Sequence, residues 1–316
     1  MSNRVWLASY PKSGNTWMRL LIGCLSLKDG EAVDINKTAG NCGIASGRGP
    51  FDDLTLIDSG LLTHDEIDRL RPRVYEGLTR AAEEEVQDEP RTPPPVRFAK
   101  THDAYTLTPL GEPLLAGARG AKGAIVIVRD PRDVAPSLAN HRRTTIDEAI
   151  DFMSDPRAIF SARTDRQERQ FRQCLLGWSG HIASWLDQRD IPVHLVRYED
   201  LKRDTAGTLL AAMGFAGFPA TRKQIARAVS LAAFDTLQAQ EREIGFAEWR
   251  GGEGDLFFRR GKTGAWRNEM TAEQVACIES AHGMMMDQLG YELSTEPQTV
   301  RSKELIVPAI NHMGRL

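Results

Sequence analysis

The sequence has no apolar run long enough to cross a membrane. A spanning helix needs about 20 consecutive, mostly apolar residues, whereas the longest apolar stretches here cover only residues 20–27 and 124–128. The apolar stretch near the beginning of the chain, residues 5–8, is too short for the core of a secretory signal. These absences predict a cytoplasmic protein without a membrane-spanning segment.

Cysteine is scarce, and charge of one sign is not in excess. The four cysteines lie far apart, without any C-x-x-C pair: Cys24, Cys42, Cys174 and Cys277. Neither a zinc site nor a disulfide framework is therefore predicted. The 40 Lys and Arg residues against 43 Asp and Glu residues give a net charge of −3, so neither nucleic acid nor an anionic membrane is the expected partner. Any anion-binding site must be local.

Short β-prone runs alternate with longer helical patterns along the 316 residues. The runs predict strands at 5–9, 96–102, 123–128 and 192–198. The helical patterns predict helices at 16–27, 132–143, 166–188, 205–213, 221–231 and 271–288. Alternation of this kind indicates a mostly parallel sheet flanked by helices. We predict a single α/β domain, residues 1–292, followed by a loosely attached tail, residues 293–316.

Two segments do not fit the alternation. Residues 28–95 begin rich in Gly and Asp, and a capping-box pattern at 63–66 then predicts a helix that runs towards residue 86. This stretch is predicted to be an insertion. Residues 245–264 contain six glycines, too many for a packed element, and are predicted to be a lid that becomes ordered over a bound ligand.

Residues 10–17, Tyr-Pro-Lys-Ser-Gly-Asn-Thr-Trp, join the first predicted strand to the first predicted helix. Backbone N–H groups and the positive end of the helix converge at such a junction, which is where proteins bind phosphate. The segment differs from the nucleoside-triphosphate loop G-x-x-x-x-G-K-[ST], because Lys12 precedes Gly14 and no hydroxyl is placed for magnesium. It predicts a phosphate loop of another kind.

Five blocks, in the same order along the chain, resemble the cytosolic-type sulfotransferases. That family transfers a sulfuryl group from 3′-phosphoadenosine 5′-phosphosulfate (PAPS) to an acceptor. The blocks are residues 10–17, 100–102 (K-T-H), 128–137 (V-R-D-P-R-D-V-A-P-S), 197–201 (R-Y-E-D-L) and 257–268 (F-F-R-R-G-K-T-G-A-W-R-N). The resemblance implies a P-loop-like parallel sheet, PAPS as co-substrate with adenosine 3′,5′-bisphosphate as product, no metal, and a small-molecule acceptor.

The resemblance also implies roles for individual residues. The loop that binds the 5′-phosphosulfate is made of Lys12, Ser13, Gly14, Asn15, Thr16 and Trp17. The residues implied to be catalytic are Lys12, Lys100, His102 and Ser137. The rest of the nucleotide site is formed by Arg129, Ser137, Tyr198, Phe234, Arg259, Arg260 and Gly261, with Phe234 against adenine. Four residues depart from the family pattern: Asn15, Ala232, Arg260 and Ala265.

The chemistry of these residues fits the transfer. Lys12 would stabilise the oxygen that leaves with the donor's 5′-phosphate. His102 has an ordinary pKa near 6.5 and can remove a proton from an acceptor hydroxyl near neutral pH. The acceptor pocket is expected among residues 28–95, about 144–165 and 245–264. Other polar residues are predicted to be ordinary surface groups: His64, His141, His194, His282, Arg142, Arg143, Arg166, Arg169 and Arg172. Trp178 and Trp185 are predicted core residues.

Two other functions are compatible with parts of the pattern. A P-loop kinase or another NTPase would explain the strand–loop–helix opening and Asp130 near the end of a strand, but its G-K-[ST] signature is missing. A catalytically silent nucleotide-binding module on the same fold would also keep the phosphate loop, although His102 argues against it. The leading hypothesis is a sulfotransferase that acts on a hydroxyl or amine.

Overall fold

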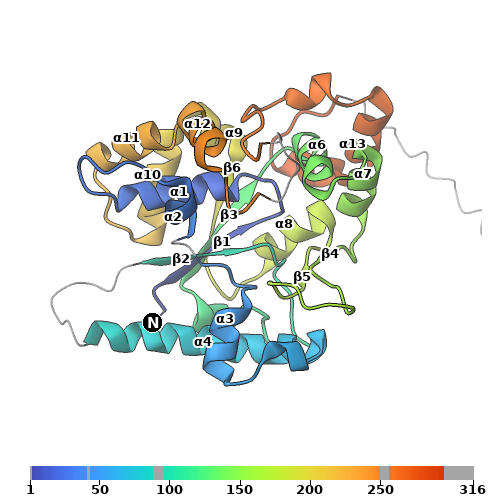
Figure 1. The fold of residues 1–316 in the computed structure, drawn as a ribbon. Helices are drawn as coiled ribbons and strands as arrows, with labels where there is room; N and C mark the ends of the chain where they lie inside the picture. Colours follow the sequence, from blue (N-terminus) through green and yellow to red (C-terminus); the bar gives the residue numbers. More distant parts are fainter. Residues whose placement is uncertain (1, 41–42, 88–95, 250–255, 295–316) are drawn as a thin grey trace, which may run out of the picture.

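A four-stranded parallel sheet forms the centre of the computed structural model, which describes residues 2–40, 43–87, 96–249 and 256–294 (Figure 1). The strands run in the order β2-β1-β3-β6, and every neighbouring pair is parallel. Their bounds are β1 Arg4–Ser9, β2 Arg97–Thr101, β3 Gly123–Val128 and β6 Val193–Arg197. All four predicted strands are therefore confirmed, and their carboxyl ends meet at one edge of the sheet.

Helices occupy most of the remaining described chain. The first half contains α1 Asn15–Leu25, α2 Ile35–Gly40, α3 Arg48–Thr55, η1 Ser59–Leu61, α4 His64–Gln87, α5 Gly117–Gly120, α6 Pro131–Arg142 and α7 Ile146–Ser154. The second half contains α8 Gly177–Asp187, α9 Tyr198–Arg203, α10 Thr205–Ala216, α11 Arg222–Leu231, α12 Phe234–Ile244, η2 Ala265–Asn268 and α13 Ala272–Gln288. A short hairpin joins β4 Ile159–Phe160 to β5 Gln173–Cys174. None of the described helices is both long and apolar enough to cross a membrane.

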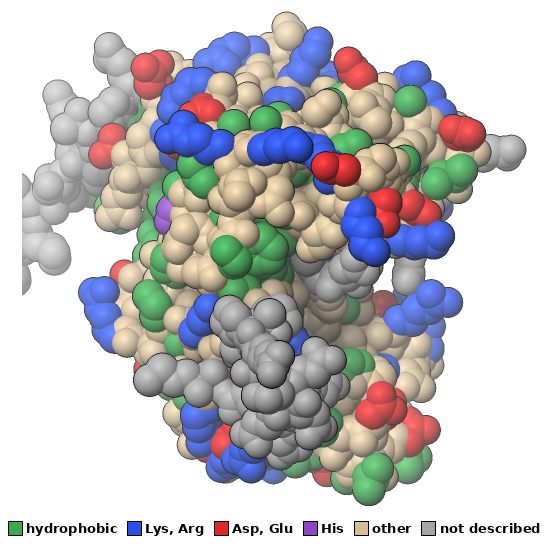
Figure 2. Space-filling view, turned by 90° about the vertical axis from the view of Figure 1, so that its left-hand side faces the viewer, with side chains coloured by type: hydrophobic (Ala, Val, Ile, Leu, Met, Phe, Trp, Pro, Cys, Tyr) green, Lys and Arg blue, Asp and Glu red, His purple; other side chains and the backbone are tan. Residues whose placement is uncertain are grey.

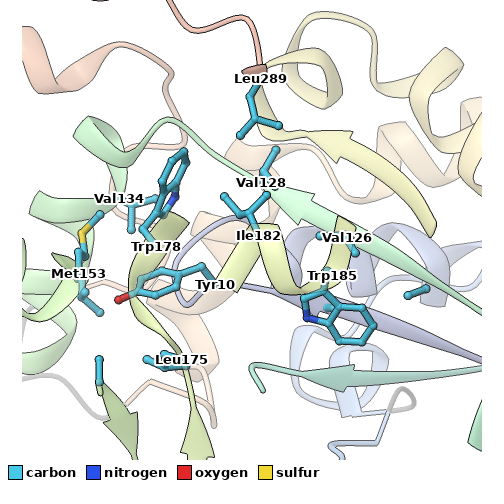
Figure 3. Packing of buried hydrophobic residues seen from close by; sticks show 14 of the residues in the cluster. Tyr10, Val126, Val128, Val134, Met153, Leu175, Trp178, Ile182, Trp185 and Leu289 are labelled. Atoms are coloured by element: carbon cyan, nitrogen blue, oxygen red, sulfur yellow. The ribbon is translucent and has the colours of Figure 1, made fainter. Parts of the chain in front are cut away.

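The two faces of the sheet pack against different groups of helices (Figure 1). Successive side chains of a strand point to opposite faces, so alternate residues of β1 and β3 enter separate cores. On one face, Val126 and Val128 belong to the same buried cluster as Trp178 and Trp185 of α8 (Figure 3), and both tryptophans are confirmed as core residues. The opposite core is formed with α1, α10 and α11.

The inserted segment packs beside the sheet, partly in a small core of its own residues with Phe171 and partly against the main core. Helix α4 continues through Pro72 and packs Tyr75 edge-on against Trp6, with ring centroids 5.4 Å apart. Arg71 of α4 is buried and pairs with Asp103, which follows β2, at 2.6 Å. Arg172, predicted as a surface charge, pairs with Asp65 and Asp68 at 2.6 and 2.7 Å. That prediction was wrong because carboxylates of α4 approach Arg172 from a distant part of the sequence.

The predicted helix at 166–188 begins only at Gly177. Leu176 and Gly177 both have left-handed backbone angles, with φ of 60° and 68°, so a regular helix cannot pass through them. The apolar residues before this point, Phe171 and Leu175, are buried from an extended segment, and this mimics a helical pattern. Helices α7 and α12 were not predicted. Residues 250–255 of the predicted lid and residues 295–316 of the predicted tail lie outside the described residues, as does Cys42.

Candidate active site

A cavity of about 970 Å³ lies where the carboxyl ends of β1, β2 and β3 meet the phosphate loop and the 256–265 segment. It brings together nearly every residue that the sequence singled out: Lys12, Gly14, Asn15, Thr16, Trp17, Lys100, His102, Arg129, Ser137, Tyr198, Phe234, Arg259, Arg260 and Gly261. Ser13 is the exception, since it is fully buried beneath the loop. The cavity is also lined by each of the three segments expected around the acceptor, for example by Ile44, Phe160 and Ala247.

Local backbone geometry shapes the phosphate loop. Lys12 and Gly14 both have positive φ, 69° and 101°, and these reverse the chain between β1 and α1. Gly14 is required for a second reason: a Cβ there would lie 2.5 Å from Cδ2 of Tyr198. Helix α1 has no side-chain cap at its N-terminus, so its first N–H groups are available to an anion.

Arg129 connects the phosphate loop to the late sequence block. Its guanidinium donates to the backbone oxygens of Lys12 and Lys262 at 3.3 and 3.1 Å, and it lies 4.7 Å from the ring centre of Tyr198. Arg259 and Arg260 are both held by Glu269, at 3.0 and 2.6 Å. These contacts place all three predicted phosphate-binding arginines on acidic or backbone partners around one cavity.

Asp133 was not assigned a role from the sequence, although it lies within the third block. Its carboxylate accepts hydrogen bonds from the backbone N–H groups of Gly264 and Trp266, at 2.7 and 3.0 Å. It therefore holds the late block against α6. The departure at Ala265 leaves this attachment intact, because the contacts are made by the neighbouring backbone. The D-V pair shared with the family pattern was the signal that could have identified Asp133.

The predicted adenine pocket is formed by aromatic side chains. Trp17 donates from its indole nitrogen to the backbone oxygen of Ala232 at 2.9 Å, which fixes the ring. Phe234 packs so closely on Gly261 that a Cβ there would lie 2.2 Å from Cδ2 of the phenyl ring. Lys202 lies 5.0 and 5.9 Å from the ring centres of Trp17 and Phe234. Two aromatic faces and a cation thus border one part of the cavity.

Lys12 and Lys100 are cations in an environment that disfavours their charge. Burial lowers the pKa of Lys12 to about 7, and repulsion from Lys100, Arg129 and Arg259 adds to the effect. Burial also lowers the pKa of Lys100 to about 8, with a further contribution from Arg19. The Lys12 ammonium lies 4.2 Å from the ring centre of Phe257. A bound anion would relieve the repulsion between these cations.

Glu248 partly offsets this charge, and sequence reasoning missed it. Its carboxylate accepts two hydrogen bonds from Arg19, at 2.6 and 2.7 Å, and lies 3.8 Å from Lys100. Arg19 is almost fully buried on α1. The surrounding cations hold the pKa of Glu248 below its usual value despite burial. Neither Arg19 nor Glu248 stands in a recognised block, so their pairing required the three-dimensional structure.

The orientation of His102 is set by a backbone atom. Its Nδ1 lies 2.7 Å from the carbonyl oxygen of Ser9. Because a carbonyl only accepts hydrogen bonds, Nδ1 carries the proton and Nε2 has the free electron pair. Burial, followed by the charge of Lys100, lowers the pKa of His102 well below its ordinary value. The imidazole is therefore neutral at pH 7 and can accept a proton at Nε2.

Asn15 supports this arrangement instead of pointing at a ligand. Its side-chain amide donates to the backbone oxygen of Leu7 at 2.8 Å and to the hydroxyl of Ser9 at 3.2 Å. Both donor hydrogens are thus used within the protein, and only the backbone N–H can serve the predicted phosphate loop. The first turn of α1 and the strand end that orients His102 are therefore tied together.

The histidines predicted to be surface groups differ in their surroundings. His141 is exposed, as predicted, and lines the cavity at the end of α6. His282 is buried, with Nδ1 2.9 Å from the hydroxyl of Ser179 and its ring edge-on to Trp178. The apolar surroundings in the α13 core explain why the prediction for His282 was wrong. Among the described residues, no group of three or more His, Cys, Asp or Glu side chains is arranged to hold a metal ion.

Sequence comparisons agree with the geometry. The family model described as "Sulfotransferase domain" matches residues 2–290. The chain is 28% identical over 290 residues to flavonol 3-sulfotransferase of Flaveria bidentis, covering 88% of this chain and 80% of the relative. It is 24% identical over 279 residues to luciferin sulfotransferase of Photinus pyralis, covering 85% of this chain and 68% of the relative.

Solved structures share the fold. The mouse sulfotransferase SULT7A1, crystallised with PAP, has a TM-score of 0.53 and 19% identity over 90% of this chain and 83% of its own. Retinol dehydratase, complexed with androsterone and PAP, has a TM-score of 0.53 and 22% identity over 93% of this chain and 83% of its own. The predicted P-loop-like parallel sheet is thereby confirmed. With a family match across nearly all described residues, the chain belongs to the sulfotransferase family.

Proposed function

We propose that the protein transfers the sulfuryl group of PAPS to a hydroxyl or amine of a small or medium-sized acceptor. The observation that carries this proposal is the convergence on one cavity of His102, with Nε2 available, and of the phosphate-loop cation Lys12. Family membership supports the reaction type. A kinase reaction is not favoured, since the phosphate loop lacks the G-K-[ST] arrangement that holds magnesium nucleotide.

The reaction follows from these positions. His102 Nε2 takes the proton of the acceptor hydroxyl as the acceptor oxygen bonds to sulfur. The bond between sulfur and the donor's 5′-phosphate oxygen breaks, and Lys12 stabilises the negative charge that develops on that oxygen. Arg129, Ser137 and Arg259 would bind the 3′-phosphate, since guanidinium groups form strong paired hydrogen bonds with phosphate. The products are the sulfated acceptor and adenosine 3′,5′-bisphosphate.

Incubation with PAPS labelled in the sulfuryl group tests the proposal directly. A panel of phenols, alcohols, amines and sugars serves as acceptors, and labelled products are separated by chromatography. We expect at least one acceptor class to be sulfated. Tight binding of adenosine 3′,5′-bisphosphate without any transfer would instead identify a catalytically silent module, and a preference for ATP would revive the kinase hypothesis.

Transfer is expected to continue in excess chelator. The cations that neutralise the donor are protein side chains, and a sulfuryl group in transfer carries less negative charge than a phosphoryl group. We expect the initial rate with EDTA to stay within twofold of the rate with added magnesium. A strict requirement for magnesium would show that a metal ion helps to stabilise the leaving oxygen, the role assigned to Lys12.

Donor-product affinity is expected to fall as the pH rises above about 7. The lowered pKa of Lys12, about 7, means that free protein increasingly carries a neutral lysine above that pH. A bound phosphate favours the charged form, so binding then requires uptake of a proton and weakens by up to about tenfold per pH unit. Calorimetric titration with adenosine 3′,5′-bisphosphate at pH 6.5 to 9 measures this.

The variant Lys12→Arg is the matched control for that titration. An arginine stays charged over the whole pH range, so its affinity should change much less between pH 7 and 9. A wild-type affinity that does not change with pH would contradict the assignment of Lys12 to the phosphate site.

A further inference from the structure

The cavity carries more positive charge than the proposed donor can neutralise. Twelve Lys and Arg side chains line it, against four carboxylates, Asp133, Glu168, Glu248 and Glu269. PAPS carries about four negative charges near neutral pH, which leaves roughly four cations in excess. The whole chain, by contrast, has a net charge of −3, and basic and acidic side chains are interspersed on the face shown in Figure 2. The positive charge is therefore concentrated at the cavity.

The cations divide into two groups by their place in the fold. Six belong to the proposed donor site: Lys12, Arg129, Lys202, Arg259, Arg260 and Lys262. The other six come from elsewhere: Arg19 on α1, Lys100 on β2, Arg142 at the end of α6, and Arg163, Arg166 and Arg169 between β4 and β5. Of this second group, Arg163 lies within a segment expected around the acceptor, about 144–165, and Arg166 and Arg169 follow it on the same connection between β4 and β5.

Most of the second group already has a partner. Arg19 and Lys100 share Glu248, and Arg142 lies 3.7 Å from the ring centre of Phe152. Arg163 forms two hydrogen bonds with the carboxylate of Asp165, at 2.8 and 2.6 Å.

Arg166 and Arg169 differ from these cations. Both are exposed, and neither has a hydrogen-bond or ion-pair partner in the described part of the chain. Glu168, which lies between them in sequence, contributes the one carboxylate of the 161–170 segment that lines the cavity. The net charge that the 161–170 segment presents to the cavity therefore remains positive. The sequence had indicated ordinary surface charges, but the fold places both guanidinium groups on the cavity.

We propose that the acceptor carries, besides the group that receives the sulfuryl, at least one anionic group, and that Arg166 and Arg169 bind it. This inference rests on the proposed sulfuryl transfer. Guanidinium groups pair in a planar, two-point geometry with carboxylate, sulfate and phosphate oxygens, which defines the chemical class. A cationic acceptor is disfavoured, since it would approach a wall of like charge.

A matched pair of fluorescent phenols tests the proposal. The anionic probe is 8-hydroxypyrene-1,3,6-trisulfonate, and the neutral probe is 1-hydroxypyrene. Fluorescence titration measures the affinity of each for the full-length protein, with and without saturating adenosine 3′,5′-bisphosphate. Saturation with the nucleotide prevents the trisulfonate from occupying the donor site. Sulfation of both probes by PAPS is followed in parallel, so binding is measured even when turnover is slow.

Two double variants provide the comparison. Arg166→Glu with Arg169→Glu reverses the proposed anion site. Arg189→Glu with Arg222→Glu reverses two exposed arginines that do not line the cavity and changes the net charge equally. We expect wild-type protein to bind the trisulfonate at least tenfold more tightly than the neutral probe. The first variant should lower this ratio at least tenfold, and the control should change it less than twofold.

A wild-type preference for the neutral probe, or equal changes in the two double variants, would overturn the inference. Raising the salt concentration should weaken trisulfonate binding to wild type, because the arginines are exposed and their charges are screened. Failure of the sulfotransferase assignment appears differently: the protein would then not bind adenosine 3′,5′-bisphosphate, or would transfer no sulfuryl group to any acceptor of the wider panel.

Discussion

We expect His102→Ala to lower the rate of sulfuryl transfer by about 10²–10⁴-fold, the usual contribution of a general base. The affinity for adenosine 3′,5′-bisphosphate should stay within about twofold, because the imidazole acts on the acceptor proton. Steady-state rates with PAPS, together with calorimetric titration of the product nucleotide, separate the two effects. A variant that kept most of its activity with a hydroxyl acceptor would show that His102 is not the base.

The dependence of the wild-type rate on pH gives a second test of His102 as the general base. An unperturbed imidazole would lose activity as the pH falls through about 6.5. Burial and Lys100 lower the pKa of His102, so the neutral, active form should persist further into acid, and the loss should occur below that pH. His64→Ala is the control, since His64 is half-buried on the first turn of α4 and does not line the cavity.

Arg129→Ala is expected to raise the KM for PAPS by about 10- to 150-fold, which corresponds to losing one hydrogen bond to a charged group. The same substitution should raise the KM for adenosine 5′-phosphosulfate, which lacks the 3′-phosphate, by less than threefold. Comparison of the two donors therefore isolates the 3′-phosphate. Equal losses with both donors would show that Arg129 acts only through the backbone of Lys12 and Lys262.

Ser137→Ala allows the same comparison of the two donors, and it removes no contact to the phosphate loop. Its hydroxyl lines the cavity and has no hydrogen bond to the described protein residues. We expect the KM for PAPS to rise, by less than in Arg129→Ala. The KM for adenosine 5′-phosphosulfate should change little. Arg157→Ala serves as the charge control, because Arg157 is 89% exposed and lies outside the cavity.

The parts of the fold that could be predicted were those with local signals. The apolar run of β3 and the Pro-Lys-Ser-Gly turn after β1 are continuous in sequence, and the structure places both as expected. The helix predicted from residue 166 failed because Phe171 and Leu175 reach the core from an extended segment. Apolar spacing alone does not distinguish these two ways of burying a side chain.

In the candidate site, too, residues with local sequence signals could be predicted, and contacts between distant residues could not. Lys12 and His102 lie in short blocks and were found from the sequence, whereas Arg19 and Glu248 meet across 229 positions of the chain. Glu248 has no neighbours in sequence that would mark it. The side-chain contacts of Asn15 could not be predicted for a related reason: its amide donates back to β1, and a contact with a backbone atom carries no residue-type signal.

The bond between His102 and the carbonyl of Ser9 limits what a mutation at position 9 can change. Every amino acid contributes the same main-chain oxygen, so a codon change at position 9 alters the hydroxyl but cannot delete the atom that fixes the imidazole tautomer. The contact that sets the tautomer of the proposed base thus does not depend on the side chain at that position. Position 15 differs, because the contact between its amide and β1 depends on one particular side chain. Ser9→Ala should therefore keep the carbonyl contact to His102, whereas Asn15→Ala would remove both contacts that its amide makes with β1.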